Sequence, residues 1–284
     1  MPASVADLSE KTIGFLGCGK ISSCMVRGYA TAKGTQRPAK ILVSKRSEAK
    51  SAALARDFPG YVEVCEDNAD LVTRSDVVFL GLLPPTAREL LPTMPFGGET
   101  SSKLIISMLA AMDIGELRAL CSGVPESQIV RTVPLPSVAR QQGPILVHPV
   151  LENCISILEI VGTPVSCEQE SEMKPLVCLT GHISSFYELM KTSEEFMTNN
   201  GVNPVAARTF VSAFYSSMAA NTEVSTNVSL ADMAIEAATP GGINEQGIDY
   251  LKIETKHFQN QTKSLEEVYD RLMGKTAYVK RQPK

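Results

Sequence analysis

The sequence lacks any segment long and apolar enough to resemble a membrane span, and it lacks the cysteine spacing of a zinc site. Its apolar runs fall well short of the length that a bilayer requires, so we expect no transmembrane helix. The seven cysteines include no CxxC pair and their number is odd, which favours reduced thiols in an intracellular protein and no metal. The first eleven residues lack a basic-then-apolar signal, so the expected location is cytoplasmic.

The chain also lacks an excess of positive charge. Its formal net charge is −4 over 284 residues, which argues against a partner such as nucleic acid or an anionic membrane. Apolar residues make up 44% and charged residues 20%, as in an ordinary globular protein. The length suits one large domain or two modest ones.

Short apolar runs alternate with segments of helical periodicity up to about residue 163. We predict strands at 12–16, 40–43, 77–83, 104–108, 129–133, 145–147 and 158–161, and early helices at 18–32 and 48–57. Continuous apolar runs of this kind are typical of parallel strands that are buried on both faces. Residues 1–163 are therefore expected to form an α/β domain.

The pattern changes near Gly162-Thr163-Pro164, after which only helical periodicity is found. We predict helices over 174–199, from Asn203-Pro204 onward, from the Pro240-Gly241-Gly242 turn towards residue 258, and over 264–273 with a capping box at Ser264 and Glu267. Residues 164–284 are expected to form an all-α domain. Its apolar helix faces would pack either on one another or against a second subunit.

A glycine loop follows the first predicted strand and opens the first predicted helix. It reads Gly17-Cys18-Gly19-Lys20-Ile21-Ser22, which fits the G-x-G-x-x-small pattern of dinucleotide-binding turns. The first glycine permits a tight turn, and the second lets the backbone approach a pyrophosphate at the helix N-terminus. This strand-turn-helix setting predicts a Rossmann-type domain.

The residues after the second predicted strand indicate which dinucleotide is bound. An NAD site requires an acidic residue at this position, whereas this chain has Ser44-Lys45-Arg46-Ser47. Two cations and two hydroxyls suit the 2′-phosphate of NADP(H). The alternative is an ordinary solvated turn, although the missing carboxylate counts against it.

The order of these motifs resembles the pyrroline-5-carboxylate reductase family. The segments that carry the resemblance are Ile13 to Ile21, Val43 to Ser47, Asp67-Asn68 ahead of Ser75 to Leu80, Ile106 to Ala111, Val130 to Pro134, and Ala238 to Gly242. The resemblance covers nearly the whole chain and depends on this collinearity, because no single segment is decisive. It implies a Rossmann domain followed by an all-α dimerisation domain that interlocks two subunits.

The same resemblance implies a reaction and further site residues. The reaction is hydride transfer from NADPH to a cyclic imine that carries a carboxylate, with proline as the family's product. The implied cofactor contacts are Asn68, Leu82, Leu83, Pro84, Met108 and Ala110, and the implied substrate contacts are Pro134, Leu135, Gly241, Gly242, Ile243 and Asn244.

The sequence departs from the family where the substrate is expected. The family's lysine is lost in Gly81-Leu82-Leu83-Pro84, Leu135-Pro136 replaces an Asn-Thr pair, and Ile243-Asn244 replaces two threonines that help to hold the substrate carboxylate. Ile243 has no side-chain donor, and losing a hydrogen bond to a charged group costs about 1.5–3 kcal/mol. We therefore expect the substrate to be a carboxylate-bearing imine, or alternatively a carbonyl compound, that need not be pyrroline-5-carboxylate.

The proton donor stays open at this level. The candidates are His182, Tyr187 and Lys191, each of which has an ordinary alternative as a structural or solvated side chain. A protonated imine would need no strong acid, whereas a carbonyl would need one. The remaining alternatives are a related enzyme that reduces a ketoacid, and a non-catalytic protein that binds NADPH.

Overall fold

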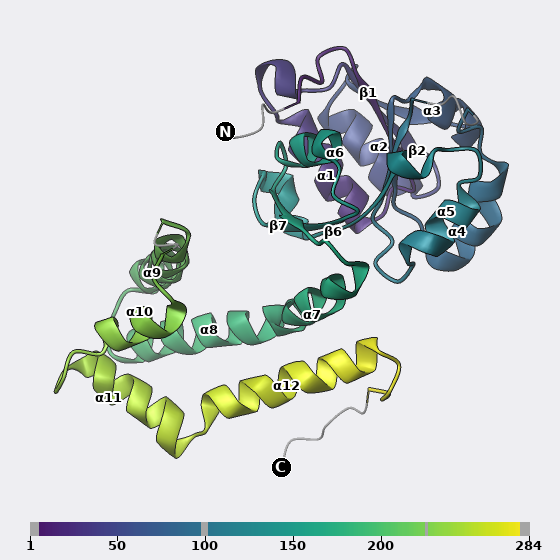
Figure 1. The fold of residues 1–284 in the computed structure, drawn as a ribbon. Coiled ribbons are helices and arrows are strands. Elements are labelled where there is room, and N and C mark those ends of the chain that lie inside the picture. The colour runs from purple at the N-terminus through teal and green to yellow at the C-terminus, as the bar shows by residue number, and fades with distance from the viewer. Residues whose placement is uncertain (1–5, 98–101, 225–226, 279–284) are drawn as a thin grey trace. The chain divides into compact units, whose positions relative to one another are not determined.

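The computed structural model describes residues 6–97, 102–224 and 227–278. The chain divides into two compact units, Met1–Met173 and Lys174–Lys284 (Figure 1). The sequence places the boundary after residue 163. In the structure Thr163–Ser166 forms a strand of the first unit's sheet, so the α/β unit continues past that point.

The first unit contains a single eight-stranded sheet. Its strands are β1 (Thr12–Leu16), β2 (Lys40–Ser44), β3 (Val62–Cys65), β4 (Val77–Leu80), β5 (Leu104–Ser107), β6 (Ile129–Pro134), β7 (Pro144–His148) and β8 (Thr163–Ser166). The strand order is β3-β2-β1-β4-β5-β6-β7-β8, and β1 to β6 are all parallel. The order 3-2-1-4-5-6 is that of a Rossmann fold, so the predicted fold of this domain is confirmed.

Three features of the sheet differ from the sequence expectation. β3 was not predicted, because Val62-Glu63-Val64-Cys65 alternates and forms no continuous apolar run. β7 runs antiparallel to β6. The predicted strand at 158–161 is wrong: these residues end a helix and enter a turn. Three of the four residues are apolar, and Leu158 and Val161 are fully buried. Periodicity cannot separate such a short buried helix end from a strand.

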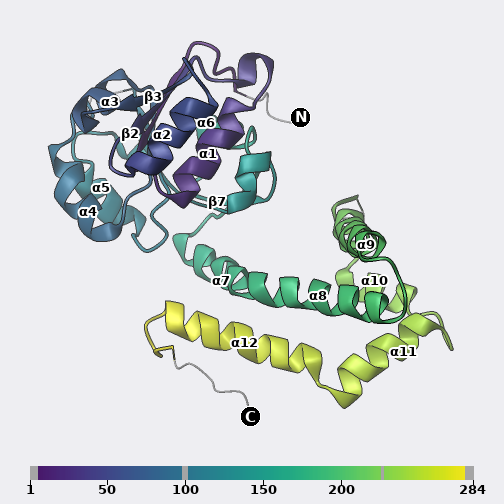
Figure 2. The ribbon, with the colours of Figure 1, turned by 180° about the vertical axis from the view of Figure 1, so that it is seen from behind.

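Helices cover both faces of this sheet. They are α1 (Lys20–Ala30), α2 (Glu48–Asp57), α3 (Asn68–Arg74), α4 (Pro84–Leu90), α5 (Ile114–Leu120) and α6 (Glu152–Leu158). Buried residues of α1, α2 and α6 join one core cluster and those of α3, α4 and α5 join another, so the two sets lie on opposite faces (Figure 2). The α/β unit is therefore a three-layer sandwich.

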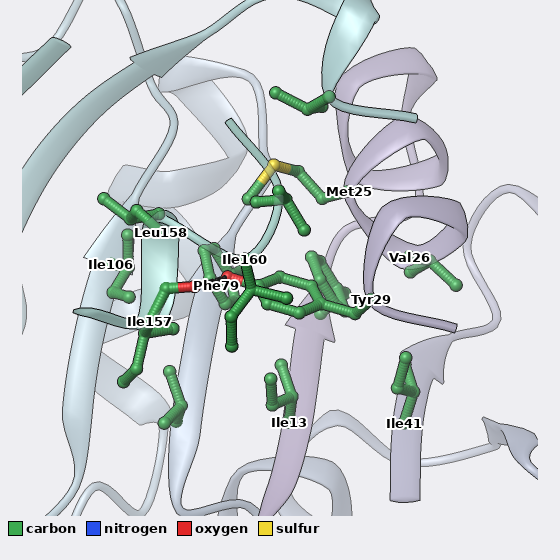
Figure 3. Packing of buried hydrophobic residues seen from close by; sticks show 14 of the residues in the cluster. Ile13, Met25, Val26, Tyr29, Ile41, Phe79, Ile106, Ile157, Leu158 and Ile160 are labelled. Atoms are coloured by element: carbon green, nitrogen blue, oxygen red, sulfur yellow. Dashed lines mark hydrogen bonds between the residues drawn. The ribbon is translucent and has the colours of Figure 1, made fainter. Parts of the chain in front are cut away.

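The larger core cluster lies between α1, α6 and the sheet. Tyr29 of α1 packs against Phe79 of β4 with ring centroids 5.8 Å apart. Its hydroxyl donates a hydrogen bond to the carbonyl of Ile157 at 3.1 Å (Figure 3). This bond satisfies the only polar atom of a fully buried side chain, and it ties α6 to α1 across the core.

The second unit is helical, as predicted. Its helices are α7 (Met173–Cys178, which begins at the boundary), α8 (Ile183–Asn199), α9 (Pro204–Val224), α10 (Leu230–Ala237), α11 (Ile243–Asp249) and α12 (His257–Leu272). Asn203 caps α9 by accepting the N–H of Val205 at 2.9 Å, which confirms the predicted start. None of the helices in the described ranges is long and apolar enough to span a membrane.

Two helix boundaries in this unit differ from the sequence prediction. A short 3-10 turn, Leu179–His182, interrupts the helix expected over 174–199. The predicted capping box at Ser264 is wrong, because α12 begins at His257 and Ser264 lies in its interior. The Ser264 hydroxyl instead lies 3.1 Å from Nε2 of His182, so a tertiary contact uses the group that local reasoning assigned to a cap.

The helical unit buries few of its side chains. In helices α8 to α12, as far as the structure describes them, the buried residues are Ala207 and Val211, both on α9. Phe210 is 60% exposed and Ile235 is 73% exposed. Large apolar side chains exposed to this extent are unusual on the surface of a monomeric protein.

Candidate functional site

The turn after β1 can be formed only by glycine at position 17. Gly17 has a φ of +97°, and a Cβ there would lie 2.4 Å from the carbonyl oxygen of Gly81. Its N–H donates a buried hydrogen bond of 2.9 Å to the hydroxyl of Ser44, at the end of β2. The turn is thus fixed against the ends of both β2 and β4.

Gly19 serves a different purpose. It is the N-cap of α1, it has no side chain to cap the helix, and a Cβ there would meet only the Gly81 carbonyl oxygen, at 3.9 Å. The protein therefore has room for a side chain at position 19, but glycine leaves that room empty. That room lies at the N-terminus of an eleven-residue helix, where backbone N–H groups attract an anion.

The remaining residues of the loop support this arrangement. Ser22 is 1% exposed, and its hydroxyl lies against Gly81, so a small residue is needed for α1 to approach β4. Cys18 is buried, and burial raises the pKa of its thiol, which keeps the side chain neutral beside the helix N-terminus. Ile21 is half-buried and Lys20 is exposed.

The loop lies at the switch point of the sheet, where β1 has β2 on one side and β4 on the other. Ligands of open α/β sheets bind at this point, beyond the carboxyl ends of the strands. A hollow of about 230 Å³ opens there, lined by Gly17, Ser44, Arg46, Asn68, Leu82, Thr86, Glu89 and Leu90. Five of the residues that the sequence predicted for the cofactor thus meet in one place: Gly17, Ser44, Arg46, Asn68 and Leu82.

The two cations after β2 have different surroundings. Lys45 forms an exposed ion pair with Glu66, with Nζ and Oε2 2.6 Å apart. Arg46 lines the hollow, and within residues 6–97, 102–224 and 227–278 no carboxylate pairs with it. Ser47 follows as the N-cap of α2. The guanidinium of Arg46 is thus available to a phosphate.

The other predicted cofactor residues lie at the same carboxyl edge. Leu83 is 72% exposed and Pro84 is the first residue of α4. Met108 follows β5, and its N–H donates to the carbonyl of Leu80 at 2.9 Å. Ala110 lies two residues further on and is exposed. Parallel strands β1, β2, β4 and β5 place all of these segments at one edge.

A buried arginine fixes the loop that contains Ala110. Arg131 of β6 donates to the Ala110 carbonyl at 2.7 Å and pairs with Glu170 at 2.9 Å. The same Glu170 oxygen accepts the N–H of Ile114 at 2.9 Å. The Arg131 side chain is 8% exposed, so this pair is largely removed from water. The sequence indicated Arg131 only as part of a motif, because its partner lies far along the chain.

Comparison with known proteins agrees with this geometry. Residues 12–111 match the family described as NADP oxidoreductase, coenzyme F420-dependent. A pyrroline-5-carboxylate reductase of Acremonium sp is 24% identical over 276 residues, which cover 85% of this chain and 86% of the relative. One of Methanosarcina acetivorans is 25% identical over 254 residues, which cover 86% and 91%. Over most of its length this chain is therefore similar to pyrroline-5-carboxylate reductases, at low sequence identity.

A solved structure of the family supports the fold. Plasmodium falciparum pyrroline carboxylate reductase with NADP bound superimposes with a TM-score of 0.73 at 16% identity, covering 94% of this chain and 99% of that one. The matching model and the two relatives identify this chain as an NADP-dependent oxidoreductase. The cradle at Gly17 to Gly19 and the available Arg46 fit that cofactor.

The residues predicted to contact substrate fall in both units. Pro134 and Leu135 lie at the carboxyl end of β6, where Pro134 is buried and Leu135 half-buried. Gly241 has a φ of +73°, and Gly242 is the N-cap of α11. Ile243 is 85% exposed. The amide of Asn244 donates to the Ala237 carbonyl at 3.0 Å.

Sequence reasoning did not identify Glu245, which lies beside these residues. Its Oε2 accepts a hydrogen bond of 2.7 Å from the N–H of Gly241. An acidic side chain in the first helical turn that reaches back to a preceding N–H is a recognised capping arrangement. The sequence signal that could have indicated this contact is an acidic residue one helical turn after Gly241.

The three candidate proton donors are also placed in the helical unit. His182 Nε2 lies 3.1 Å from the Ser264 hydroxyl. Lys191 forms a hydrogen bond of 3.0 Å to Glu188, and this bond raises the pKa of the lysine, which favours its charged form. Tyr187 is 65% exposed, with its ring centroid 6.3 Å from that of Phe186.

Proposed function

We propose that this chain reduces the C=N bond of a cyclic imine with NADPH, in the way that the family's name reaction converts pyrroline-5-carboxylate to proline. The proposal rests on the carboxyl edge of the sheet, where the predicted cofactor residues lie; we call it the cofactor edge. A glycine turn with room above Gly19, a helix N-terminus and an available Arg46 guanidinium all lie at the switch point of one sheet. The similarity to pyrroline-5-carboxylate reductases supports the imine as substrate.

Each part of this edge has a role in the proposal. The N-terminus of α1 would hold the pyrophosphate, and Arg46 and Ser47 would hold the 2′-phosphate. Asn68 and Leu82 line the hollow. NADPH bound at this edge would supply a hydride to the imine carbon. The π electrons of the C=N bond move to nitrogen, which carries the proton, and the products are a cyclic amine and NADP⁺.

The surroundings of the candidate donors favour an imine over a carbonyl. A cyclic imine can arrive protonated on nitrogen, so the enzyme need not supply a strong acid. Glu188 keeps Lys191 in its charged form through an exposed ion pair. Ser264 lies within hydrogen-bond distance of His182. A carbonyl substrate would require a proton donor, and two of the three candidates, His182 and Lys191, would have to leave these contacts to serve as one.

The cofactor half of the proposal is tested by paired substitutions after β2. Arg46→Ala is expected to raise the Kd for NADPH by about 10- to 100-fold, as for a lost hydrogen bond to a charged group, with little effect on NADH. Lys45→Ala is the matched control, because Glu66 already holds the amine of Lys45. Its effect on NADPH binding should be smaller. Equal Kd values for NADPH and NADH in the wild-type protein would contradict the assignment.

The reaction itself is tested by NADPH oxidation against a panel of cyclic imines, with pyrroline-5-carboxylate as the reference, and of ketoacids. Turnover of imines supports the proposal. Turnover of ketoacids alone would make the chain a carbonyl reductase. NADPH binding without turnover of any compound would make it a non-catalytic cofactor-binding protein.

We propose further that the chain works as a homodimer assembled through its helical unit. The 21-residue helix α9 buries only Ala207 and Val211, while Phe210, Phe214 and Met218 on it are 60%, 46% and 46% exposed. A second copy of the chain supplies a matching apolar face by symmetry. Light scattering at micromolar concentration should give twice the mass of the chain, and a monomer at that concentration would exclude this assembly.

A further inference from the structure

We propose that Glu245 makes this enzyme select cyclic imines that lack a carboxylate. The inference rests on the proposed function and on the Gly241 to Asn244 turn as part of the substrate site. It replaces the expectation of a carboxylate-bearing imine.

Three hydrogen-bond donors of that turn are bonded within the chain. The N–H of Gly241 donates to the Glu245 carboxylate at 2.7 Å. The N–H of Gly242 donates to the Thr239 carbonyl at 2.8 Å. The side-chain amide of Asn244 donates to the Ala237 carbonyl at 3.0 Å. A substrate carboxylate would have to displace these acceptors to be held by the same groups.

The acceptor on Gly241 is itself an anion. A substrate carboxylate that approaches the Gly241 N–H meets the negative charge of Glu245, which already accepts that N–H. Like charges within a few ångströms repel, and the repulsion grows as water is excluded from a closed site. Ile243 follows directly, and its side chain offers neither a donor nor a positive charge to compensate.

The surroundings of α11 also carry negative charge. A hollow of about 740 Å³ runs along α11 and the π-turn Tyr250–Glu254 that follows it. Its lining residues are Ile243, Gln246, Gly247, Asp249, Tyr250, Leu251, Ile253 and Glu254. Two of them are acidic and none is basic. A protonated cyclic imine is a small apolar cation, which suits such a lining, whereas an added carboxylate does not.

The test compares two substrates that differ only in the carboxylate. These are 1-pyrroline and pyrroline-5-carboxylate, each assayed by NADPH oxidation with the full-length enzyme. We expect the wild-type kcat/KM for 1-pyrroline to exceed that for pyrroline-5-carboxylate by about tenfold or more. A wild-type preference for pyrroline-5-carboxylate would overturn the inference and leave the proposed function standing.

Substitution of Glu245 assigns the preference to this residue. Glu245→Gln removes the charge but keeps an oxygen that can accept the Gly241 N–H, so the turn retains its shape. We expect the ratio of the two kcat/KM values to fall about tenfold through a rise for pyrroline-5-carboxylate. Glu236→Gln on α10 removes one exposed negative charge outside the turn and should leave the ratio unchanged.

The possible failures are distinguishable. An unchanged ratio in Glu245→Gln would show that the charge of Glu245 does not select the substrate, even where 1-pyrroline is the better substrate. The absence of turnover with both imines, in a protein that binds NADPH, would instead remove the proposed function and this inference with it.

Discussion

Both units of the chain contain a glycine turn that leads into a helix, and the two turns differ in what their N–H groups contact. At Gly17 one N–H is bonded to Ser44, and the helix N-terminus at Gly19 keeps open room beside it. At Gly241 and Gly242 both N–H groups are bonded within the chain, one of them to a carboxylate. The glycine pattern alone therefore does not show that a turn binds an anion; the acceptors already present decide it.

The same contrast extends to the units as wholes. The α/β unit buries apolar side chains on both faces of its sheet and assembles its cofactor edge from a single chain. The helical unit leaves large apolar side chains such as Phe210 and Ile235 exposed. The cofactor half is thus complete in one copy of the chain, whereas the helical half is expected to be completed by a second copy.

The largest effect on stability is expected from a substitution in the core of the α/β unit. Arg131→Met removes one partner of a buried ion pair and leaves the Glu170 carboxylate without its counter-charge. Such a loss costs about 3–5 kcal/mol of unfolding free energy. Hydrogen exchange followed by mass spectrometry should show faster exchange in peptides of β5 and β6, with α8 to α12 little affected.

A double variant separates charge from packing at this position. Arg131→Met with Glu170→Gln removes both charges and should recover part of the lost stability, because no unpaired carboxylate remains. If the double variant is less stable than Arg131→Met alone, the buried charge of Glu170 is not the source of the effect.

Intermediate effects on stability and NADPH binding are expected from substitutions in the first glycine turn. Gly17→Ala places a Cβ 2.4 Å from the Gly81 carbonyl oxygen at a φ of +97°, so about 1–3 kcal/mol of stability should be lost together with NADPH binding. Gly19→Ala should fold normally but bind NADPH about tenfold or more weakly, because only the cofactor competes for that room. Thermal unfolding and NADPH titration measure the two quantities.

Gly241→Ala is the matched variant in the second turn. Its φ of +73° makes the substitution unfavourable, although a Cβ there meets no other atom within 4 Å. A loss of about 1 kcal/mol is expected, with an unchanged Kd for NADPH. Weaker NADPH binding in this variant would contradict the division of roles between the turns.

The smallest expected effect is a pH dependence confined to the α/β unit. Hydrogen bonds from Arg74 and Lys40 lower the pKa of Glu63 from 4.5 to about 2. Because the folded-state pKa is lower than the unfolded one, this stability is present above about pH 5 and is lost as the pH falls towards 2. Glu63 is 36% exposed, so solvent screening limits the effect to about 1 kcal/mol or less.

Glu63→Gln tests this linkage. The difference in unfolding free energy between pH 7 and pH 3 should be smaller in the variant than in the wild-type protein, as measured by urea denaturation at each pH. An equal difference in the two proteins would assign the acid sensitivity of the unit to other carboxyl groups.

Much of the α/β unit could be predicted from the sequence because its signals are local. The helix at Glu48–Asp57 has the predicted bounds, and the turn at Gly17 follows from the steric needs of the backbone. The run at 158–161 was misassigned because a buried helix end is as apolar as a strand. Ser264 was misassigned because its hydroxyl lies against His182, which is distant in sequence.

The sequence by itself determined the strand-turn-helix start of a Rossmann-type domain, the glycine cradle and the preference for NADP(H), since each depends on residues that are close together along the chain. The tertiary structure decided which charged groups are available. It paired Lys45 with Glu66 while leaving Arg46 at the hollow, it buried Arg131 against Glu170, and it placed Glu245 on Gly241. The physical reason is that a charge is available to a ligand only when no partner already lies within a few ångströms, and folding sets those distances.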